Sequence, residues 1–220
     1  MAHACRTSSP AFCDRVARMS DGSLIESMQR FYNAIARRTP DLAFVNYGFV
    51  DNPDEPSEDL DLIRMCRRLY EAVLEPFPIA TGTAVEVGCG RGGGARMLLD
   101  RHQALRYVGL DLSAEHLDLS RRRLTPRPFT SFAMADAAAL PVAYASADVL
   151  YSIEAAQHFE HPDRFYREAA RVVRPRGWFL LAALWPPSKL PYAPLEAAGF
   201  RIDERVDITA NVVASLERTS

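Results

Sequence analysis

Residues 85–94 read VEVGCGRGGG, a short apolar run that leads directly into a cluster of glycines. Five of the last seven positions are glycine, which is more than a tight turn alone requires. Glycines, which have no Cβ atom, let the backbone come close to a ligand and point N–H groups at it, above all where a helix begins. The stretch therefore predicts a strand, a ligand-binding turn and the start of a helix, in that order.

The sequence around this turn alternates between short apolar or β-branched runs and helical patterns. Strands are expected over residues 83–87, 106–110, 129–133, 148–153 and 177–184. Helices are expected between them over residues 93–102, 114–124 and 162–173. Such runs with intervening helices indicate a parallel sheet that is covered on both faces. We therefore predict an α/β fold, a doubly wound Rossmann-like mostly parallel sheet with helices on both faces.

The predicted sheet domain occupies residues 79–220, and two segments precede it. Residues 1–20 are small and polar without a period, which predicts a weakly ordered N-terminus. Residues 21–78 carry two amphipathic patterns, the first beginning at Leu24 and the second over residues 58–75. This segment is therefore expected to be helical.

The composition is that of an ordinary globular protein and argues against several functions. The chain has 220 residues, 48% of them hydrophobic and 25% charged, and a formal net charge of −2. So small a charge gives no field that would attract nucleic acid or anionic lipid. The four cysteines form no CxxC pair and no zinc-ligand spacing, so reduced thiols are expected, and the sequence shows no Asp/Asp/Asn metal cluster, so we expect no metal. No stretch has the pattern of a signal peptide or a membrane span, so we expect a cytoplasmic protein.

The glycines alone leave the ligand open, because Gly88, Gly90 and Gly93 also satisfy the GxGxxG pattern of dinucleotide sites. Glu86 lies two residues before the first glycine and is expected beside the ligand. There it can meet a cationic amino group or a ribose, whereas it would repel a pyrophosphate. This acid favours S-adenosylmethionine over a dinucleotide.

Two further acids follow neighbouring strands of the predicted sheet. Asp111 ends the second strand, and a carboxylate at the carboxyl end of a strand can accept both ribose hydroxyls. NAD sites share this feature, so Asp111 indicates a nucleoside without choosing the ligand. Asp136 follows the third strand, where its carboxylate can accept a hydrogen bond from an adenine amino group.

As a set, these motifs resemble the class I S-adenosylmethionine-dependent methyltransferases over about residues 83–185. Residues 85–94 are similar to their first motif, YVGLDLS at 107–113 to their second, and residues 134–141 and 146–182 to their later ones. The resemblance implies S-adenosylmethionine as the cofactor. The residues that it implies at the cofactor are Glu86, Gly88, Gly90, Asp111, Leu112, Asp136 and Ala137. The first three would lie near the methionine and ribose, the next two at the ribose and adenine, and the last two at the adenine edge.

Three other stretches are similar to a group of bacterial small-molecule and lipid methyltransferases. They are NYGF at 46–49, GRGGG at 90–94 and DITANV at 207–212. That group includes the phthiotriol/phenolphthiocerol dimycocerosate methyltransferases, with sterol and sugar methyltransferases as more distant relatives. The resemblance implies that residues 21–78 fold over the site as a lid and that Tyr47 contacts the cofactor. For Tyr47 we give equal weight to an alternative, in which its aromatic ring only fills the seam between lid and core.

The chain departs from this family at its C-terminal end. The class I domains that it resembles close with a seventh, antiparallel strand after the sixth. Here a sixth strand is expected over residues 200–208 and a helix over residues 209–218, and the sequence then ends. We therefore expect the seventh strand to be missing, which leaves a sheet edge open.

Methyl transfer from a sulfonium requires nucleophile, methyl and sulfur in line, and a hydroxyl acceptor must also lose its proton. His158, after the fourth strand, is the expected general base, because a histidine titrates close to working pH. A plain polar contact at a helix end is the competing interpretation. Glu154 is expected to orient that base or to line the pocket. His161 precedes Pro162 and is expected to be a helix N-cap rather than a catalytic group.

The expected function is methyl transfer to a hydroxyl, or a carbon, of a hydrophobic small molecule in natural-product or lipid biosynthesis. An NAD(P)-dependent oxidoreductase is disfavoured by Glu86, by Asp136 and by the lack of a Tyr/Lys pair, since Lys189 is the only lysine. A non-catalytic cofactor-binding partner protein is the other alternative. We expect a hydrophobic small-molecule substrate, no nucleic acid and no membrane span. The sequence leaves the oligomeric state open, a homodimer included.

Overall fold

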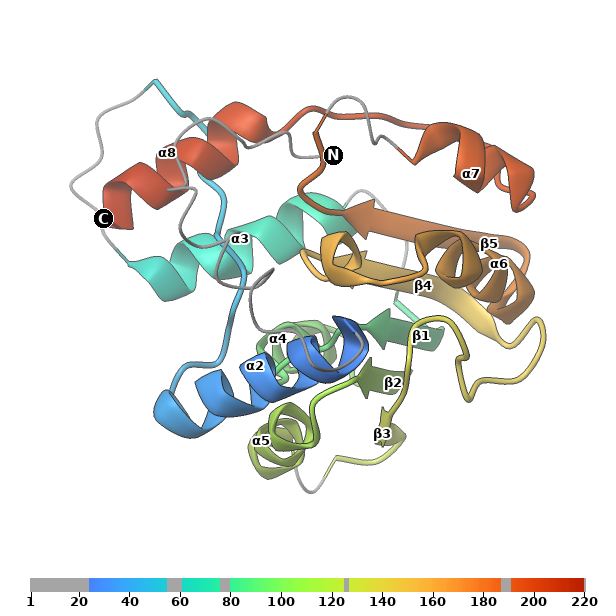
Figure 1. Cartoon of the computed structure of the whole chain (residues 1–220), viewed down its shortest axis with the longest axis horizontal. Coiled ribbons are helices and arrows are strands. Elements are labelled where there is room, and N and C mark those ends of the chain that lie inside the picture. The colour runs from blue at the N-terminus through green and yellow to red at the C-terminus, as the bar shows by residue number, and fades with distance from the viewer. Residues whose placement is uncertain (1–23, 55–60, 76–79, 125–126, 187–190, 220) are drawn as a thin grey trace.

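The computed structural model describes residues 24–54, 61–75, 80–124, 127–186 and 191–219. These residues form one sheet with helices packed around it (Figure 1). The expected N-terminal segment, residues 1–20, lies outside the described residues. Within the described ranges, no helix is both long enough and apolar enough to span a membrane.

The sheet has five strands in the order β3-β2-β1-β4-β5, and every neighbouring pair is parallel. The strands are β1 (Gly82–Val87), β2 (Leu105–Asp111), β3 (Thr130–Met134), β4 (Ala147–Ile153) and β5 (Val173–Ala182). The chain starts in the middle with β1, winds outward to β3 and then returns to place β4 on the other side of β1. The expected doubly wound fold is confirmed, and β1 and β4 flank the switch point at which such sheets bind ligands.

The burial of the strands follows their place in the sheet. β1 and β4, in the middle, are apolar runs whose side chains are buried over most of their length. β3, at one edge, alternates between half-buried and exposed side chains. Continuous apolar runs suit central strands because helices cover both faces of a parallel sheet.

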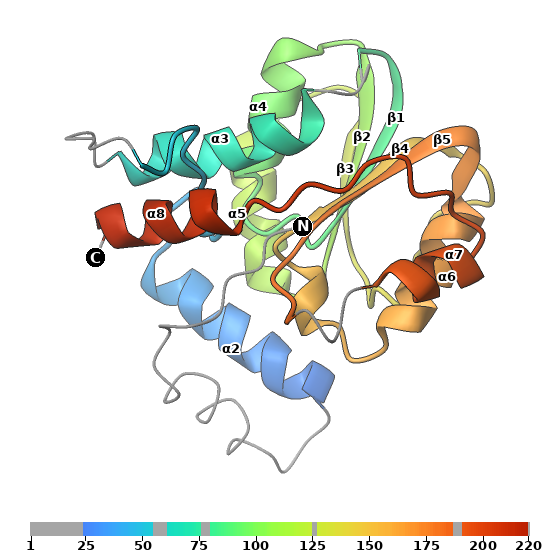
Figure 2. The ribbon, with the colours of Figure 1, turned by 90° about the horizontal axis from the view of Figure 1, so that it is seen from above.

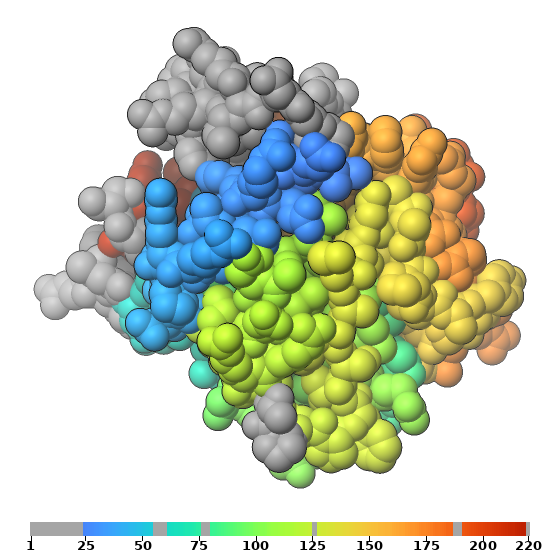
Figure 3. Space-filling model, turned by 60° about the horizontal axis from the view of Figure 1, so that its bottom comes forward, coloured from blue at the N-terminus to red at the C-terminus, as the bar shows by residue number. Residues whose placement is uncertain are grey.

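Helices cover both faces of the sheet (Figure 2). One face is covered by α3 (Leu62–Leu74), α4 (Gly93–Arg101) and α8 (Thr209–Thr219), whose apolar side chains share one core with the strands. The other face is covered by α6 (Pro162–Val172) and α7 (Tyr192–Ala197). α5 (Ala114–Leu124) packs beside β2 and β3. α2 (Leu24–Arg38) lies across α5 and the chain that follows β3 (Figure 3).

The lid expected over residues 21–78 divides into two parts with different surroundings. α3 belongs to the main core, where its Leu69, Tyr70 and Leu74 pack with the sheet. α2 lies outside that core and covers the carboxyl ends of the strands. α2 and the chain that follows it therefore lie where a lid would lie, over the strand ends. α3 is instead part of the packed core.

The expected sixth strand over residues 200–208 is wrong. This stretch is described, and it has no ladder pairing with the sheet. Four of its five charged residues, Arg201, Asp203, Arg205 and Asp207, alternate with apolar residues, as in a strand. Phe200 and Ile202 pack against one core and Ile208 against the other, yet the backbone of this stretch forms no ladder with β5. Arg201 pairs with Asp203 two residues away, at 2.5 Å between Nε and Oδ1. The described sheet therefore ends at β5, without a sixth or a seventh strand.

Candidate active site

A cavity of about 120 Å³ lies at the carboxyl ends of β1, β2 and β4, beneath α2. Eight of the ten predicted site residues line it: Gly88, Gly90, Asp111, Leu112, Asp136, Ala137, Glu154 and His158. They come from four separate turns of the chain, which the parallel sheet brings to one edge. A larger open hollow of about 820 Å³ lies between α3 and residues 49–52, away from the strand ends.

The glycine turn after β1 is shaped by close packing. Gly88 has a φ of 79° and Gly90 a φ of 55°, backbone conformations that favour glycine. A Cβ atom on Gly88 would lie 2.3 Å from the Cβ atom of Ala155, in the turn after β4. The absence of a side chain at Gly88 therefore lets the turns after β1 and β4 approach each other.

Asp111, at the end of β2, connects this glycine turn to α5. Its Oδ2 atom accepts a hydrogen bond from Gly90 N at 2.8 Å, and its Oδ1 atom accepts one from Ser113 N at 2.9 Å. Asp136, in the turn after β3, accepts a hydrogen bond from Ala138 N at 2.9 Å. Both carboxylates are thus held by backbone N–H groups and face the cavity as fixed acceptors.

Glu86 has surroundings that the sequence did not indicate. It is fully buried and lies outside the cavity lining. Its carboxylate accepts hydrogen bonds from the hydroxyl groups of Tyr70 at 2.8 Å, Tyr151 at 3.1 Å and Tyr107. Burial raises the pKa of Glu86 to about 7, although the three hydroxyl donors lower it. Glu86 thus contacts three tyrosines, and its expected contact with a ligand stays a prediction.

Glu154 is the first residue after β4 and lies at the cavity. Its φ of 51° is in the left-handed region, which a non-glycine residue occupies at a cost, and such residues are frequent at functional sites. Its Oε2 atom accepts a hydrogen bond from Tyr47 N at 2.6 Å. Its Oε1 atom is enclosed and has no hydrogen-bond partner in the described part of the chain. Burial raises the pKa of Glu154 to about 7.

Tyr47 contacts the site through its backbone rather than through its ring. The ring packs against the main core, and Tyr47 does not line the cavity. This placement agrees with the alternative interpretation, an aromatic side chain in the seam between lid and core. The residue still acts on the site, because its N–H group holds Glu154.

His158 ends a short 3-10 helix, η1 (Ala156–His158), and lines the cavity. Burial lowers its pKa, which keeps the imidazole neutral over a wider pH range. His161 is the N-cap residue of α6, as expected, but its side chain makes no capping hydrogen bond. It is not among the described residues that line the cavity.

Two residues of the site were missed from the sequence, His116 in α5 and Tyr32 in α2. His116 is buried, with Nδ1 3.6 Å from Asp111 Oδ1, and its Nε2 atom has no partner among the described residues. The ring of Tyr32 lies between two histidines, with centroids 5.6 Å from His116 and 5.9 Å from His158. The position of His116 in the first turn of a helix after β2 was a usable signal, because such turns face the ligand crevice. Tyr32 carried no signal beyond its amphipathic spacing.

This fold and this site define a nucleoside-binding α/β protein, and comparisons with known proteins agree. Residues 85–181 match the family model described as "Methyltransferase domain". The chain is 32% identical to a fatty-acid O-methyltransferase of Mycolicibacterium smegmatis, over 81% of this chain and 67% of the relative. It is 28% identical to phthiotriol/phenolphthiotriol dimycocerosates methyltransferase 1 of Mycobacterium ulcerans, over 93% of this chain and 78% of the relative.

A solved structure supports the fold. Geranyl diphosphate C-methyltransferase from Streptomyces coelicolor, in complex with S-adenosyl-L-homocysteine, superposes with a TM-score of 0.72 at 17% identity. The superposition covers 90% of this chain and 87% of that one. The chain belongs to the S-adenosylmethionine-dependent methyltransferases. The alternative of an NAD(P)-dependent oxidoreductase is therefore set aside.

Proposed function

We propose that this chain transfers a methyl group from S-adenosylmethionine to a hydroxyl of a hydrophobic small molecule of the lipid or natural-product type. One observation carries the proposal. The unpaired Oε1 atom of Glu154 and the neutral imidazole of His158 line the same cavity as the nucleoside-type acceptors Asp111 and Asp136. A proton acceptor and the residues that suit the cofactor thus line one cavity.

The residues of the cavity fit the cofactor. The fixed carboxylates of Asp111 and Asp136 suit ribose hydroxyls and an adenine amino group. The enclosed Nε2 atom of His116 lacks a partner among the described residues, so it is left to bind a ligand. When bound, the cofactor supplies a methyl group that is already activated for displacement.

The protein's own part is alignment and proton removal. His158 takes the proton of the acceptor hydroxyl. Its lowered pKa keeps the imidazole neutral, and a neutral imidazole can act as a base. Before transfer, the hydroxyl donates to the free Oε1 atom of Glu154, which orients it, and it then turns its hydrogen to His158, which takes the proton. The apolar side chains of Ile25, Phe44 and Phe159 line the cavity as well and suit a hydrophobic acceptor.

The names of the two mycobacterial relatives also support a hydrophobic acceptor. They differ in the group that would be methylated, since a fatty acid presents a carboxyl group. The four acids that line the cavity, Asp111, Asp136, Glu154 and Glu160, disfavour an anionic acceptor. We therefore propose an uncharged alcohol or phenol.

The test is transfer of a labelled methyl group to a panel of hydrophobic alcohols, phenols and matched carboxylic acids. We expect label in the alcohols or phenols, in an ether that resists alkaline hydrolysis. Label that appears only in alkali-labile esters, or on carbon, would contradict the choice of a hydroxyl. Thermal-shift measurements with S-adenosylmethionine and NAD(P) provide the control for cofactor class. Binding without transfer to any acceptor would favour the non-catalytic alternative.

A further inference from the structure

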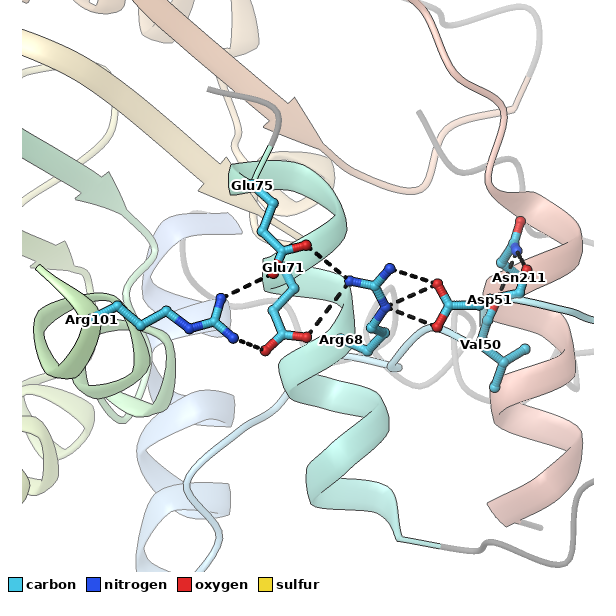
Figure 4. A network of polar contacts seen from close by, with 7 residues as sticks. All are labelled: Val50, Asp51, Arg68, Glu71, Glu75, Arg101 and Asn211. Carbon is cyan, nitrogen blue, oxygen red and sulfur yellow. Dashed lines mark hydrogen bonds and ion pairs between the residues drawn. The ribbon is translucent and has the colours of Figure 1, made fainter. Parts of the chain in front are cut away.

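The C-terminal helix α8 lies against residues 46–52, which we name the strap. Asn211 of α8 donates from Nδ2 to Val50 O at 2.7 Å and accepts at its backbone oxygen from Val50 N at 3.3 Å (Figure 4). One turn further along, Ser215 Oγ donates to Tyr47 O at 3.0 Å. Two of the stretches on which the resemblance rested, 46–49 and 207–212, are therefore in contact.

The other side of the strap is held by α3. Asn46 Nδ2 donates to Cys66 O at 3.1 Å, and Phe49 N donates to Met65 O at 3.0 Å. At its far end, Asp51 is paired with the guanidinium of Arg68, which also contacts Glu71 and Glu75 (Figure 4). The strap is thus bonded along its length between two helices.

Gly48 shows how tightly the strap is enclosed. Its φ is 78°, and a Cβ atom there would lie 2.4 Å from Ser215 Oγ and 3.0 Å from Met65 Cβ. A side chain would therefore push the strap away from α8 or α3. The fit leaves the peptide groups around Gly48 little freedom to turn.

The two backbone polar groups of Tyr47, its carbonyl oxygen and its N–H group, connect α8 to the cavity. Its carbonyl oxygen accepts from Ser215 Oγ, and its N–H group donates to Glu154 Oε2 at 2.6 Å. One carboxylate oxygen of Glu154 is therefore engaged by the strap, and the enclosed Oε1 remains for the cavity. α8 is separated from the carboxylate by a single residue of the strap.

We propose that Asn211 and Ser215 of α8 are positioning residues for Glu154, which hold the strap so that the Tyr47 N–H group fixes one carboxylate oxygen and leaves the other for the acceptor. This proposal rests on the proposed function, because that function supplies the acceptor that Glu154 would orient. The effect of α8 on the Glu154 carboxylate can be measured without any reaction, as a change in the pKa of Glu154.

The ionisation of Glu154 reports on this arrangement. The Tyr47 N–H group lowers the pKa of Glu154, against the rise that burial causes. The other titratable groups that face it are Tyr32 on α2, Cys66 on α3 and His158 in η1. None of these is altered by a substitution on α8. A strap that moves away should therefore raise the pKa of Glu154.

The experiment is an infrared pH titration of the Glu154 carboxyl group in the full chain, with Glu154→Gln to assign its band. For Ser215→Ala and for Asn211→Ala we expect the midpoint to rise by about half a unit to one unit, as expected for a weakened hydrogen bond to a charged group. Arg218→Ala is the matched control. Arg218 also joins α8 to the strap, at Asn52 O, but beyond Val50 and far along the strap from Tyr47. In Arg218→Ala, the midpoint of the Glu154 carboxyl group should stay at the wild-type value.

Two outcomes separate this inference from the proposed function. An unchanged midpoint in both Ser215→Ala and Asn211→Ala, with Glu154→Gln inactive, would overturn the positioning role and leave the function standing. A raised midpoint in both, with Glu154→Gln as active as the wild type, would support the positioning of the carboxylate and remove Glu154 from the reaction. In Ser215→Ala and Asn211→Ala, the acid limb of the kcat/KM profile should shift from its wild-type position together with the infrared midpoint.

Discussion

Asp111 performs two tasks, and its charge matters to both. Its carboxylate holds the N–H groups of Gly90 and Ser113, and it also faces the cavity as the proposed ribose acceptor. An asparagine at this position keeps the size and one acceptor oxygen but loses the charge. One of the two backbone contacts is lost with the second oxygen, so the substitution weakens the turn as well as ligand binding.

We expect Asp111→Asn to weaken S-adenosylmethionine binding about 10- to 100-fold, because a hydrogen bond to a charged group contributes about 1.5–3 kcal/mol. Titration calorimetry measures the change. Asp118→Asn, on the exposed face of α5, is the control and should bind as the wild type does. Unchanged affinity in Asp111→Asn would remove the ribose assignment.

His158 is the second single residue with a distinct expected effect. His158→Ala should lower turnover about 10²- to 10⁴-fold, the usual contribution of a general base, and leave cofactor affinity nearly unchanged. The loss should shrink at high pH, where the acceptor hydroxyl ionises without help. His161→Ala, three residues away and outside the cavity lining, should keep wild-type turnover. A fall in cofactor affinity in place of turnover would assign His158 to binding.

At the scale of elements, the hydroxyl groups around Glu86 join four elements of the fold. Tyr70 comes from α3, Tyr107 from β2 and Tyr151 from β4, and each donates to the carboxylate on β1. Burying a carboxylate costs free energy unless it is well bonded, and the three donors offset part of that cost. This cluster fixes α3 to the sheet and so supports one wall of the strap.

The pH dependence of stability tests this cluster. The pKa of Glu86 is about 7 in the folded chain, above its ordinary value of 4.5, so folding favours the protonated form. Its contribution to stability is complete below about pH 4.5 and is lost as the pH rises through about 7, by up to roughly 1.4 kcal/mol per pH unit. Denaturant unfolding across this range should show a shallower slope for Glu86→Gln. Tyr151→Phe, which keeps the carboxyl group, should retain the slope, and an equal slope in all three proteins would contradict the assignment.

At the scale of the whole molecule, α2 must move when a ligand enters. The partly open cavity of about 120 Å³ is smaller than the roughly 300–1,000 Å³ of small-molecule sites. α2 is joined to the turn after β2 by polar contacts, among them Gln29 Nε2 to Leu112 O at 3.0 Å and Ser113 Oγ to Asn33 Oδ1 at 2.6 Å. Few such contacts need to break, so α2 can open at low cost.

Hydrogen–deuterium exchange should reveal this motion. Amides of α2 should exchange quickly in the free protein and slow about 10-fold or more with S-adenosylhomocysteine, because the ligand would hold α2 closed. Amides of α6, on the far face of the sheet, should be unaffected and serve as the internal control. Identical exchange of α2 with and without ligand would show that ligands enter by another path.

The sequence by itself determined the local parts of this protein. Residues 85–94 predicted a strand, a glycine turn and a helix, and the structure has the end of β1, that turn and the start of α4 there. Asp111 and Asp136 could be placed at the cavity because they follow strands, and strands of a parallel sheet end at a common edge. Apolar runs and turn residues act over a few positions, so they can be interpreted without knowing what packs against them.

The tertiary structure alone decided which distant groups meet. Nothing in the pattern around Glu86 showed that three tyrosines would enclose its carboxylate, since their hydroxyl groups come from α3, β2 and β4. In the same way, Ser215 reaches Tyr47 from 168 positions along the chain. Residues 200–208 have the alternating pattern of a strand, but the structure gives them no ladder with the sheet. The physical reason is common to all three: burial and hydrogen-bond partners are set by packing between elements, which local periodicity does not encode.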